Sequence, residues 1–224
     1  DTEICFEDIE VVEAKGVDGI VLPKVERTAD LQMVDWMMTG LEKRRGLPVG
    51  GIDLLPIIET GKGIADVRQI AGAGVARMKR LSFGAGDYTR DMGMEWTLGE
   101  AELAPYQAEV VLASRTNDLE PPVDTVFIHI REEEAFAQSC VRVKNMGFQG
   151  KLCIHPVQIA AANAAFTPTA EETAFARKVI TEFAKAEAAG SASIQIDGYF
   201  VDYPIVVKAE RIVALADAVE QAKR

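Results

Sequence analysis

The stretch LLPIIET, residues 54–60, joins a nearly continuous apolar run to the carboxylate of Glu59. A segment with helical spacing of apolar residues, Ile64, Val67 and Ile70, follows it and ends at a glycine. A short apolar run followed by such a segment is typical of parallel strands that crossover helices bury on both faces. The stretch therefore predicts one strand, loop and helix unit of an α/β fold.

Four further apolar runs repeat this unit along the chain. They are residues 19–25 (GIVLPKV), 78–84 (MKRLSFG), 125–130 (TVFIHI) and 150–156 (GKLCIHP). Strands that alternate with helices in this way fit an open doubly wound sheet or the greater part of a (β/α) barrel. Periodicity alone does not separate these two architectures.

The pattern changes after Pro168. A long helix is expected over residues 170–189, a hairpin around Asp197-Gly198, and a closing helix over residues 204–222. We therefore expect a (β/α) barrel portion over residues 1–168 and a helical and hairpin extension over residues 169–224.

Composition and charge exclude several classes of function. The 224 residues are 48% hydrophobic and 26% charged, which is typical of globular proteins. A net charge of −11 disfavours nucleic acids and anionic membranes as partners. No targeting segment is visible, and no apolar run approaches the ~18 residues of a membrane span. Cys5, Cys140 and Cys153 form no CxxC pair, so we expect reduced thiols and a cytoplasmic protein.

Polar side chains stand at or just past the carboxyl ends of the apolar runs: Lys24, Glu59, Asp87 and His155. In both parallel architectures ligands bind at that edge of the sheet. Glu59 and Asp87 come from successive units and can converge on one point. Two carboxylates with waters suit Mg²⁺, which keeps coordination positions for water or substrate oxygens. The alternative is that each carboxylate caps the next helix or pairs with a cation such as Lys24.

The turn GAGD, residues 84–87, adds a possible anion site, because glycines let backbone N–H groups approach a ligand closely. It is neither a GxGxxG fingerprint nor a Walker A loop, so no motif supports nucleotide binding. His129 and His155 lack metal-ligand spacing, and no serine stands in a GxSxG elbow. Zincin and serine hydrolase chemistry therefore have no support.

The chain resembles the citrate lyase β-subunit-like family, which belongs to the HpcH/HpaI aldolase superfamily. The segments that carry the resemblance occur in the family's order: residues 19–26 (GIVLPKVE), 56–60 (PIIET), 81–88 (LSFGAGDY), 124–127 (DTVF), 147–158 (GFQGKLCIHPVQ) and 198–204 (GYFVDYP). The resemblance implies an eight-stranded barrel, commonly assembled as a trimer. It also implies cleavage of 3-hydroxyacyl-CoA thioesters, such as citryl-, malyl- or citramalyl-CoA, to acetyl-CoA and a 2-oxo acid.

The resemblance also implies roles for residues at the sheet edge. Glu59 and Asp87 match the positions of the Mg²⁺ ligands. The backbone N–H groups around Ala85, Gly86 and Asp87 match those that hold the carboxylate of the oxo acid. A metal chelated by the oxo-acid portion would stabilise the charge that develops when the carbon–carbon bond breaks.

Two further residues receive roles from the resemblance. Asp202 matches an acid/base residue that reaches into a neighbouring subunit's site, so the extension over residues 169–224 is expected to pack on that subunit. The alternative for Asp202 is a carboxylate that begins the helix before Pro204. His155 is expected to bind substrate by shaping the CoA channel rather than to catalyse.

The chain departs from the family at its start. Family members usually have about three more strands before the segment that matches Asp1, out of the eight of the barrel. We therefore expect either a fragment or a truncated relative, whose five-stranded arc cannot close. Two alternatives to a lyase stay open. One is a non-catalytic or accessory subunit of a citrate-lyase-like complex, and the other is a malyl-CoA thioesterase or malate-synthase-like enzyme.

Overall fold

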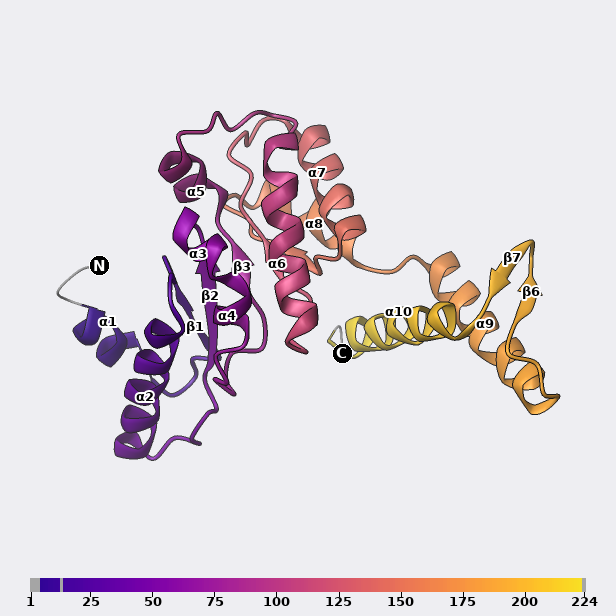
Figure 1. Cartoon of the computed structure of the whole chain (residues 1–224), viewed down its shortest axis with the longest axis horizontal. Coiled ribbons are helices and arrows are strands. Elements are labelled where there is room, and N and C mark those ends of the chain that lie inside the picture. The colour runs from indigo at the N-terminus through magenta and orange to yellow at the C-terminus, as the bar shows by residue number, and fades with distance from the viewer. Residues whose placement is uncertain (1–4, 13, 223–224) are drawn as a thin grey trace. The chain divides into compact units, whose positions relative to one another are not determined.

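The computed structural model describes residues 5–12 and 14–222, and the chain divides into two compact units (Figure 1). The first unit spans residues 1–162 and the second spans residues 163–224. A parallel sheet with intervening helices in the first unit confirms the predicted α/β class.

The sheet of the first unit has five strands that pair in the order in which they occur along the chain. All four pairings are parallel. The strands are β1 (Gly19–Leu22), β2 (Asp53–Ile58), β3 (Ser82–Phe83), β4 (Val123–Asp124) and β5 (Gly150–Lys151). A doubly wound sheet reverses its strand order at a switch point, whereas a (β/α) barrel adds strands in sequence. The observed order is that of a barrel, although within the described residues the sheet does not close and β1 and β5 are its edges.

The helices of the first unit are α1 (Cys5–Val12), α2 (Thr28–Arg45), α3 (Gly61–Ala65), α4 (Val67–Ala71), α5 (Ala85–Met92), η1 (Ala101–Leu103), α6 (Ala104–Thr116) and α7 (Glu133–Met146), and α8 (Val157–Phe166) begins in this unit and ends in the second. Of these, α2, α4, α6 and α7 form a layer that follows the order of the strands (Figure 1). Within this layer α2 packs on α4, α4 on α6, and α6 on α7. The largest fully buried side chains include Leu31, Met38, Leu54, Ile58, Ile70, Phe83, Tyr88, Leu103, Phe127 and Phe136.

The fourth strand lies upstream of its predicted place. The run 125–130 was expected to be a strand, but the structure pairs Val123 and Asp124 with β5, and the following residues form a loop. The apolar signal of this run comes from burial: Phe127 is 1% exposed, and its ring centroid lies 5.7 Å from that of Phe136. Burial of loop side chains at a sheet edge thus imitates the pattern of a buried strand.

A buried ionic cluster ties α2 to the segments that precede β2 and β3. The Arg77 side chain is 1% exposed, and its Nη1 and Nη2 atoms each donate to Glu42 at 2.8 Å. The same guanidinium donates to Asp35 Oδ1 and to the carbonyl oxygen of Ile52. These hydrogen bonds from Arg77 lower the pKa of Glu42 to about 2, and the N–H groups of Gly50 and Ile52 add to the effect.

The second unit is a helical pair with a hairpin. It contains α9 (Ala170–Ala188), β6 (Ile194–Ile196), β7 (Tyr199–Val201) and α10 (Tyr203–Ala222), which confirms the predicted helices and hairpin. Asp197 and Gly198 both have positive φ, at 50° and 86°, as the tight turn between two antiparallel strands requires. Its core consists of Ala176, Val179, Phe183, Ile196, Val201 and Ala209.

None of the helices in the described residues combines the length and apolarity of a membrane span.

Candidate functional site

Glu59 lies at the carboxyl edge of the sheet because β2 ends at the residue before it. The next residue, Thr60, caps α3, and its hydroxyl accepts a hydrogen bond from the N–H of Gly63 at 3.0 Å. The strand and the capped helix therefore hold Glu59 on both sides. Its side chain is largely buried, with 9% of the residue exposed.

Asp87 approaches Glu59 because the start of α5 is bound to the end of β2. Gly84, the residue that caps α5, donates its N–H to the carbonyl oxygen of Ile58 at 3.0 Å. A β-carbon at position 84 would lie 2.7 Å from Glu59 Oε2, closer than atoms can pack. Glycine at this position thus makes the space that the Glu59 carboxylate occupies.

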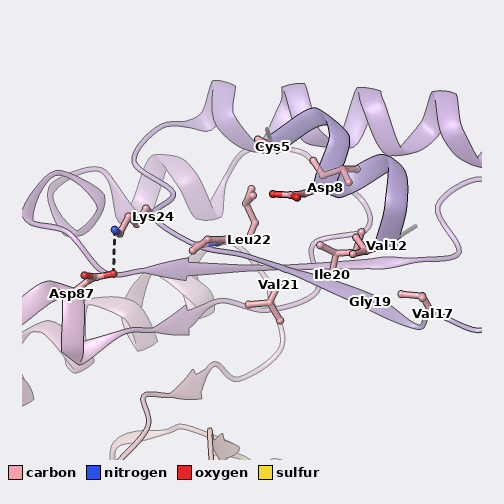
Figure 2. Close-up of a pocket in the computed structure, with 12 residues that line it drawn as sticks. Cys5, Asp8, Val12, Val17, Gly19, Ile20, Val21, Leu22, Lys24 and Asp87 are labelled. Carbon is pink, nitrogen blue, oxygen red and sulfur yellow. Dashed lines mark ion pairs between the residues drawn. The ribbon is translucent and has the colours of Figure 1, made fainter. Parts of the chain in front are cut away.

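Lys24 contacts both carboxylates from the end of β1. Its backbone N–H donates to Glu59 Oε1 at 2.9 Å, and its Nζ atom lies 3.3 Å from Asp87 Oδ2 (Figure 2). The backbone of Lys24 has a φ of 51°, in the left-handed region that a residue with a side chain seldom adopts. Such a conformation persists where surrounding contacts fix it, and it is enriched at functional sites.

The two carboxylates lie in a setting that suits a cation. Burial raises the pKa of Glu59, the N–H of Lys24 lowers it, and the charge of Asp87 raises it further. Arg90 lies 2.9 Å from the other Asp87 oxygen, so both cations pair with Asp87, while Glu59 accepts the N–H of Lys24. Among the described residues, no group of three or more His, Cys, Asp and Glu could form a metal centre. Two carboxylates fit Mg²⁺ rather than a metal that needs a full set of protein ligands, since Mg²⁺ is commonly held by one or two carboxylates with waters and substrate oxygens.

A cavity of about 680 Å³ adjoins the Lys24–Asp87 pair and runs along β1 (Figure 2). Residues 19–22 of β1 form one wall, and α1 forms another. Figure 2 shows Lys24 and Asp87 at one end of this cavity and Val17 at the other. The cavity provides space beside the Asp87 carboxylate for a ligand larger than an ion.

The first turn of α5 holds three of the residues expected to bind substrate, Ala85, Gly86 and Asp87. The N–H of Ala85 donates to Thr125 Oγ1 at 2.8 Å, so this group is already occupied. Gly86 and Asp87 follow it in the first turn, where N–H groups have no acceptor within the helix. Gly86 is exposed, so an anion can reach the backbone there.

His155 and Asp202 lie away from this pair of carboxylates along the chain. His155 is exposed in the loop between β5 and α8, and its Nδ1 atom accepts a hydrogen bond from the N–H of Val157. Asp202 belongs to the second unit and directly precedes α10. Its carbonyl oxygen accepts from Ile205 and Val206, which is the position that the helix-start alternative predicted.

Several contributors to the site were not found from the sequence. Arg90 pairs with Asp87 at the helical spacing i, i+3, and this spacing was a usable signal. The hydrogen bond from Ala85 to Thr125 joins residues 40 positions apart, and no local pattern predicts it. The left-handed backbone of Lys24 also lacks a signal, because glycine and asparagine are the residues that mark that conformation.

This chain is similar to known proteins in sequence and in fold. Residues 1–156 match the family HpcH/HpaI aldolase/citrate lyase. The chain is 34% identical to citrate lyase subunit beta of Leuconostoc mesenteroides subsp. cremoris, over 97% of this chain and 72% of that protein. It is also 34% identical to L-malyl-CoA/beta-methylmalyl-CoA lyase of Rhodobacter capsulatus, over 97% of this chain and 74% of that protein.

A solved structure gives the same fold. CitE from Mycobacterium tuberculosis, in complex with magnesium, acetoacetate and coenzyme A, has a TM-score of 0.73 at 22% identity. The match covers 97% of this chain and 75% of that one. The matching family, the two relatives and the strand order agree with one another, and the chain belongs to the HpcH/HpaI aldolase/citrate lyase family.

Proposed function

We propose that this chain is a Mg²⁺-dependent carbon–carbon lyase that cleaves a 3-hydroxyacyl-CoA thioester to acetyl-CoA and a 2-oxo acid. The observation that carries the proposal is the pair Glu59 and Asp87, which Lys24 bridges at the carboxyl edge of the sheet. The named relatives are citrate lyase and malyl-CoA lyase proteins, and the CitE structure holds magnesium and coenzyme A. Citryl-, malyl- and citramalyl-CoA are the substrate candidates.

Glu59 and Asp87 would hold the metal ion, and their donor chemistry fits it. When bound, Mg²⁺ supplies a Lewis acid for the oxygen beside the bond that breaks. The N–H groups of Gly86 and Asp87, at the positive end of α5, bind the carboxylate of the oxo acid. Lys24 Nζ keeps positive charge beside the same oxygens. The substrate would then lie in the cavity along β1, with its 3-hydroxyl at the end that Lys24 and Asp87 line.

The cleavage itself moves one proton to carbon. The 3-hydroxyl gives its proton to solvent water, and its oxygen forms the carbonyl of the 2-oxo acid. The adjacent carbon–carbon bond breaks, and the electron pair of that bond passes to the thioester as an enolate. Asp202 in its acid form then donates a proton to the enolate carbon, which gives acetyl-CoA. In the condensing direction the Asp202 carboxylate removes a proton from the methyl group. His155 contacts the CoA portion through its Nε2 edge, since its Nδ1 atom is held by Val157.

The second unit brings Asp202 to a neighbouring copy, in a homotrimer. It has its own core, and the residues around Asp202 include three exposed aromatic side chains, Tyr199, Phe200 and Tyr203, which suit burial against another surface. Cys5, Cys140 and Cys153 are free thiols, which supports a cytoplasmic location. Light scattering of the full-length protein checks the trimer, and a monomeric active enzyme contradicts this arrangement.

Asp202→Asn tests the proton transfer. We expect kcat to fall about 10²-fold or more while the Kd for Mg²⁺ stays unchanged. Asp217→Asn is the matched control, because Asp217 lies on α10 of the same unit and pairs with Arg177 at 2.5 Å. Equal activities of the two variants contradict the role of Asp202.

The substrate experiment presents citryl-, malyl- and citramalyl-CoA to the full-length protein with and without Mg²⁺. We expect acetyl-CoA and a 2-oxo acid from one of them, only with the metal. Release of free CoA instead identifies a thioesterase or a malate-synthase-like enzyme. No turnover, together with stoichiometric binding to an acyl-carrier partner, identifies an accessory subunit of a citrate-lyase-like complex.

A further inference from the structure

The first turn of α5 is capped by a residue from a different strand. Helix N-termini leave N–H groups without acceptors, and a side chain of the preceding residue usually satisfies one of them. In α5 the capping residue is Gly84, which has no side chain for this purpose. Thr125, directly after β4, accepts the N–H of Ala85 instead, at 2.8 Å. Both residues are buried, at 1% exposed for Thr125 and 0% for Ala85, so no water replaces this bond.

The turn that Thr125 caps also lies against Glu59. Gly84 donates to the carbonyl oxygen of Ile58 on β2, and its α-carbon packs against the Glu59 side chain. The turn is therefore fixed by β2 on one side and by Thr125 on the other. Asp87 lies two residues after Ala85 in the same turn. The direction of its carboxylate relative to Glu59 depends on both attachments.

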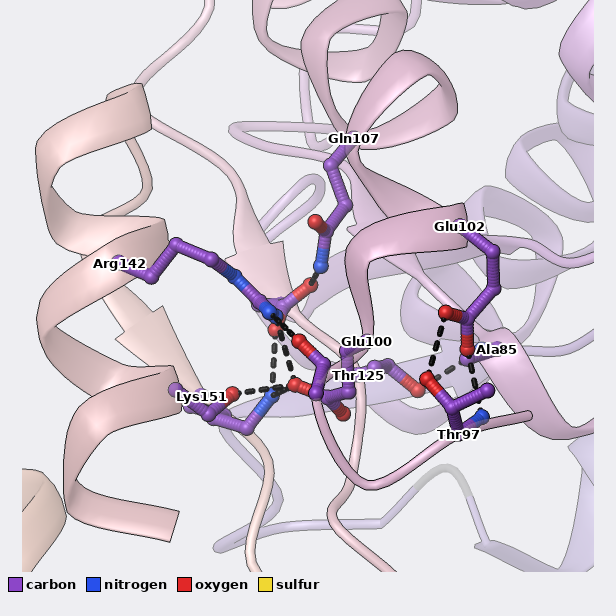
Figure 3. Close-up of polar contacts among 11 residues, drawn as sticks. Ala85, Thr97, Glu100, Glu102, Gln107, Thr125, Arg142 and Lys151 are labelled. Carbon is purple, nitrogen blue, oxygen red and sulfur yellow. Dashed lines mark hydrogen bonds and ion pairs between the residues drawn. The ribbon is translucent and has the colours of Figure 1, made fainter. Parts of the chain in front are cut away.

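Thr125 is itself held in place by a buried network (Figure 3). The neighbouring residue Asp124 is fully buried, lies 2.6 Å from Lys151 Nζ and accepts a hydrogen bond from Gln107 at 2.8 Å. Figure 3 shows Thr125 and Ala85 beside this network. A β-branched side chain on such a fixed backbone has few rotamers, so its hydroxyl has a defined direction.

We infer that Thr125 is a positioning residue for the metal and oxo-acid site. Its hydroxyl fixes the first turn of α5, and through that turn it sets the Asp87 carboxylate and the N–H groups of Gly86 and Asp87. Thr125 does not bind metal or substrate in this arrangement. The inference rests on the proposed function, in which Asp87 is a metal ligand.

The test measures Mg²⁺ binding to the full-length protein by isothermal titration calorimetry. Thr125→Val keeps the shape of the side chain and removes the acceptor, and Thr125→Ala removes the acceptor together with the methyl group. We expect both to raise the Kd for Mg²⁺ about 10-fold, the usual lower bound for loss of a partner that orients a metal ligand. Thr125→Ser keeps the acceptor and is expected to retain the wild-type Kd.

Ser114→Ala is the control for loss of a buried hydroxyl. Ser114 lies on α6 and donates to the carbonyl oxygen of Val110 at 2.8 Å, outside the site, so its removal leaves the Kd unchanged. Wild-type Mg²⁺ affinity in a folded Thr125→Val or Thr125→Ala variant overturns the inference alone. A wild-type protein that binds no Mg²⁺ overturns the proposed function, and the inference with it.

Discussion

Two buried glutamates of the first unit, Glu42 and Glu59, show opposite electrostatics. Arg77 and the N–H groups of Gly50 and Ile52 engage the Glu42 carboxylate, and the pKa of Glu42 is lowered to about 2. Glu59 receives one N–H, from Lys24, and burial beside Asp87 raises its pKa. Both oxygens of the Glu42 carboxylate accept hydrogen bonds from the protein. That of Glu59 is only partly satisfied by the protein, and this is the condition in which a carboxylate binds an added cation.

The largest effect on activity is expected when glutamine replaces Glu59, and the same replacement of Glu42 is the matched comparison. Glu59→Gln removes a proposed metal ligand, so kcat for carbon–carbon cleavage of the acyl-CoA should fall about 10³-fold or more, while far-UV circular dichroism stays unchanged. Glu42→Gln should leave kcat and the Kd for Mg²⁺ as they are but lower the stability. Steady-state kinetics and Mg²⁺ titration of both variants check this contrast. Full activity in Glu59→Gln contradicts the metal site.

Arg77→Met should have the largest effect on stability. It leaves Glu42 as a buried charge without its partner, which costs about 3–5 kcal/mol. Urea unfolding of the first unit measures the loss. The double variant Glu42→Leu with Arg77→Met replaces the whole pair by apolar groups and should recover most of it. If the double variant is as unstable as Arg77→Met, the unpaired charge is not the cause.

The pH dependence of stability gives the smallest effect. A lowered pKa means that Glu42 stabilises the folded state fully above its ordinary pKa of 4.5, and that this contribution is lost as pH falls toward about 2. The difference in unfolding free energy between the wild type and Glu42→Gln should therefore shrink over that range, by at most about 3 kcal/mol. Urea titrations at several pH values measure it. A difference that stays constant down to pH 2 contradicts the pairing with Arg77.

Much of the fold could be predicted because it follows local periodicity. The stretch 54–60 predicted both β2 and the position of Glu59. Its apolar run marks the strand, and Thr60 marks the start of the next helix, so Glu59 had to lie at the end of the strand. The same rule placed Asp87 at the neighbouring strand end. It failed for β4, where Phe127 is buried in a loop rather than in a strand.

The rest of the site could not be predicted, because it depends on contacts between distant segments. Thr125 meets Ala85 only when β4 lies beside β3, and the sequence around Thr125 is that of an ordinary apolar run. Pairing of a carboxylate with Lys24 was the alternative to a metal site, and the structure shows that pairing for Asp87. Its N–H bond to Glu59 requires a backbone conformation that nothing in the residue type predicts.

The double contact of Lys24 has a consequence for how the protein acquires its metal. Lys24 and Arg90 both pair with Asp87, so the protein itself compensates the charge of that carboxylate. A divalent ion bound as proposed would therefore take over an Asp87 oxygen that the Lys24 ammonium group holds. A newly synthesised chain with such a site would not need magnesium to fold, unlike small domains that are unfolded without their metal.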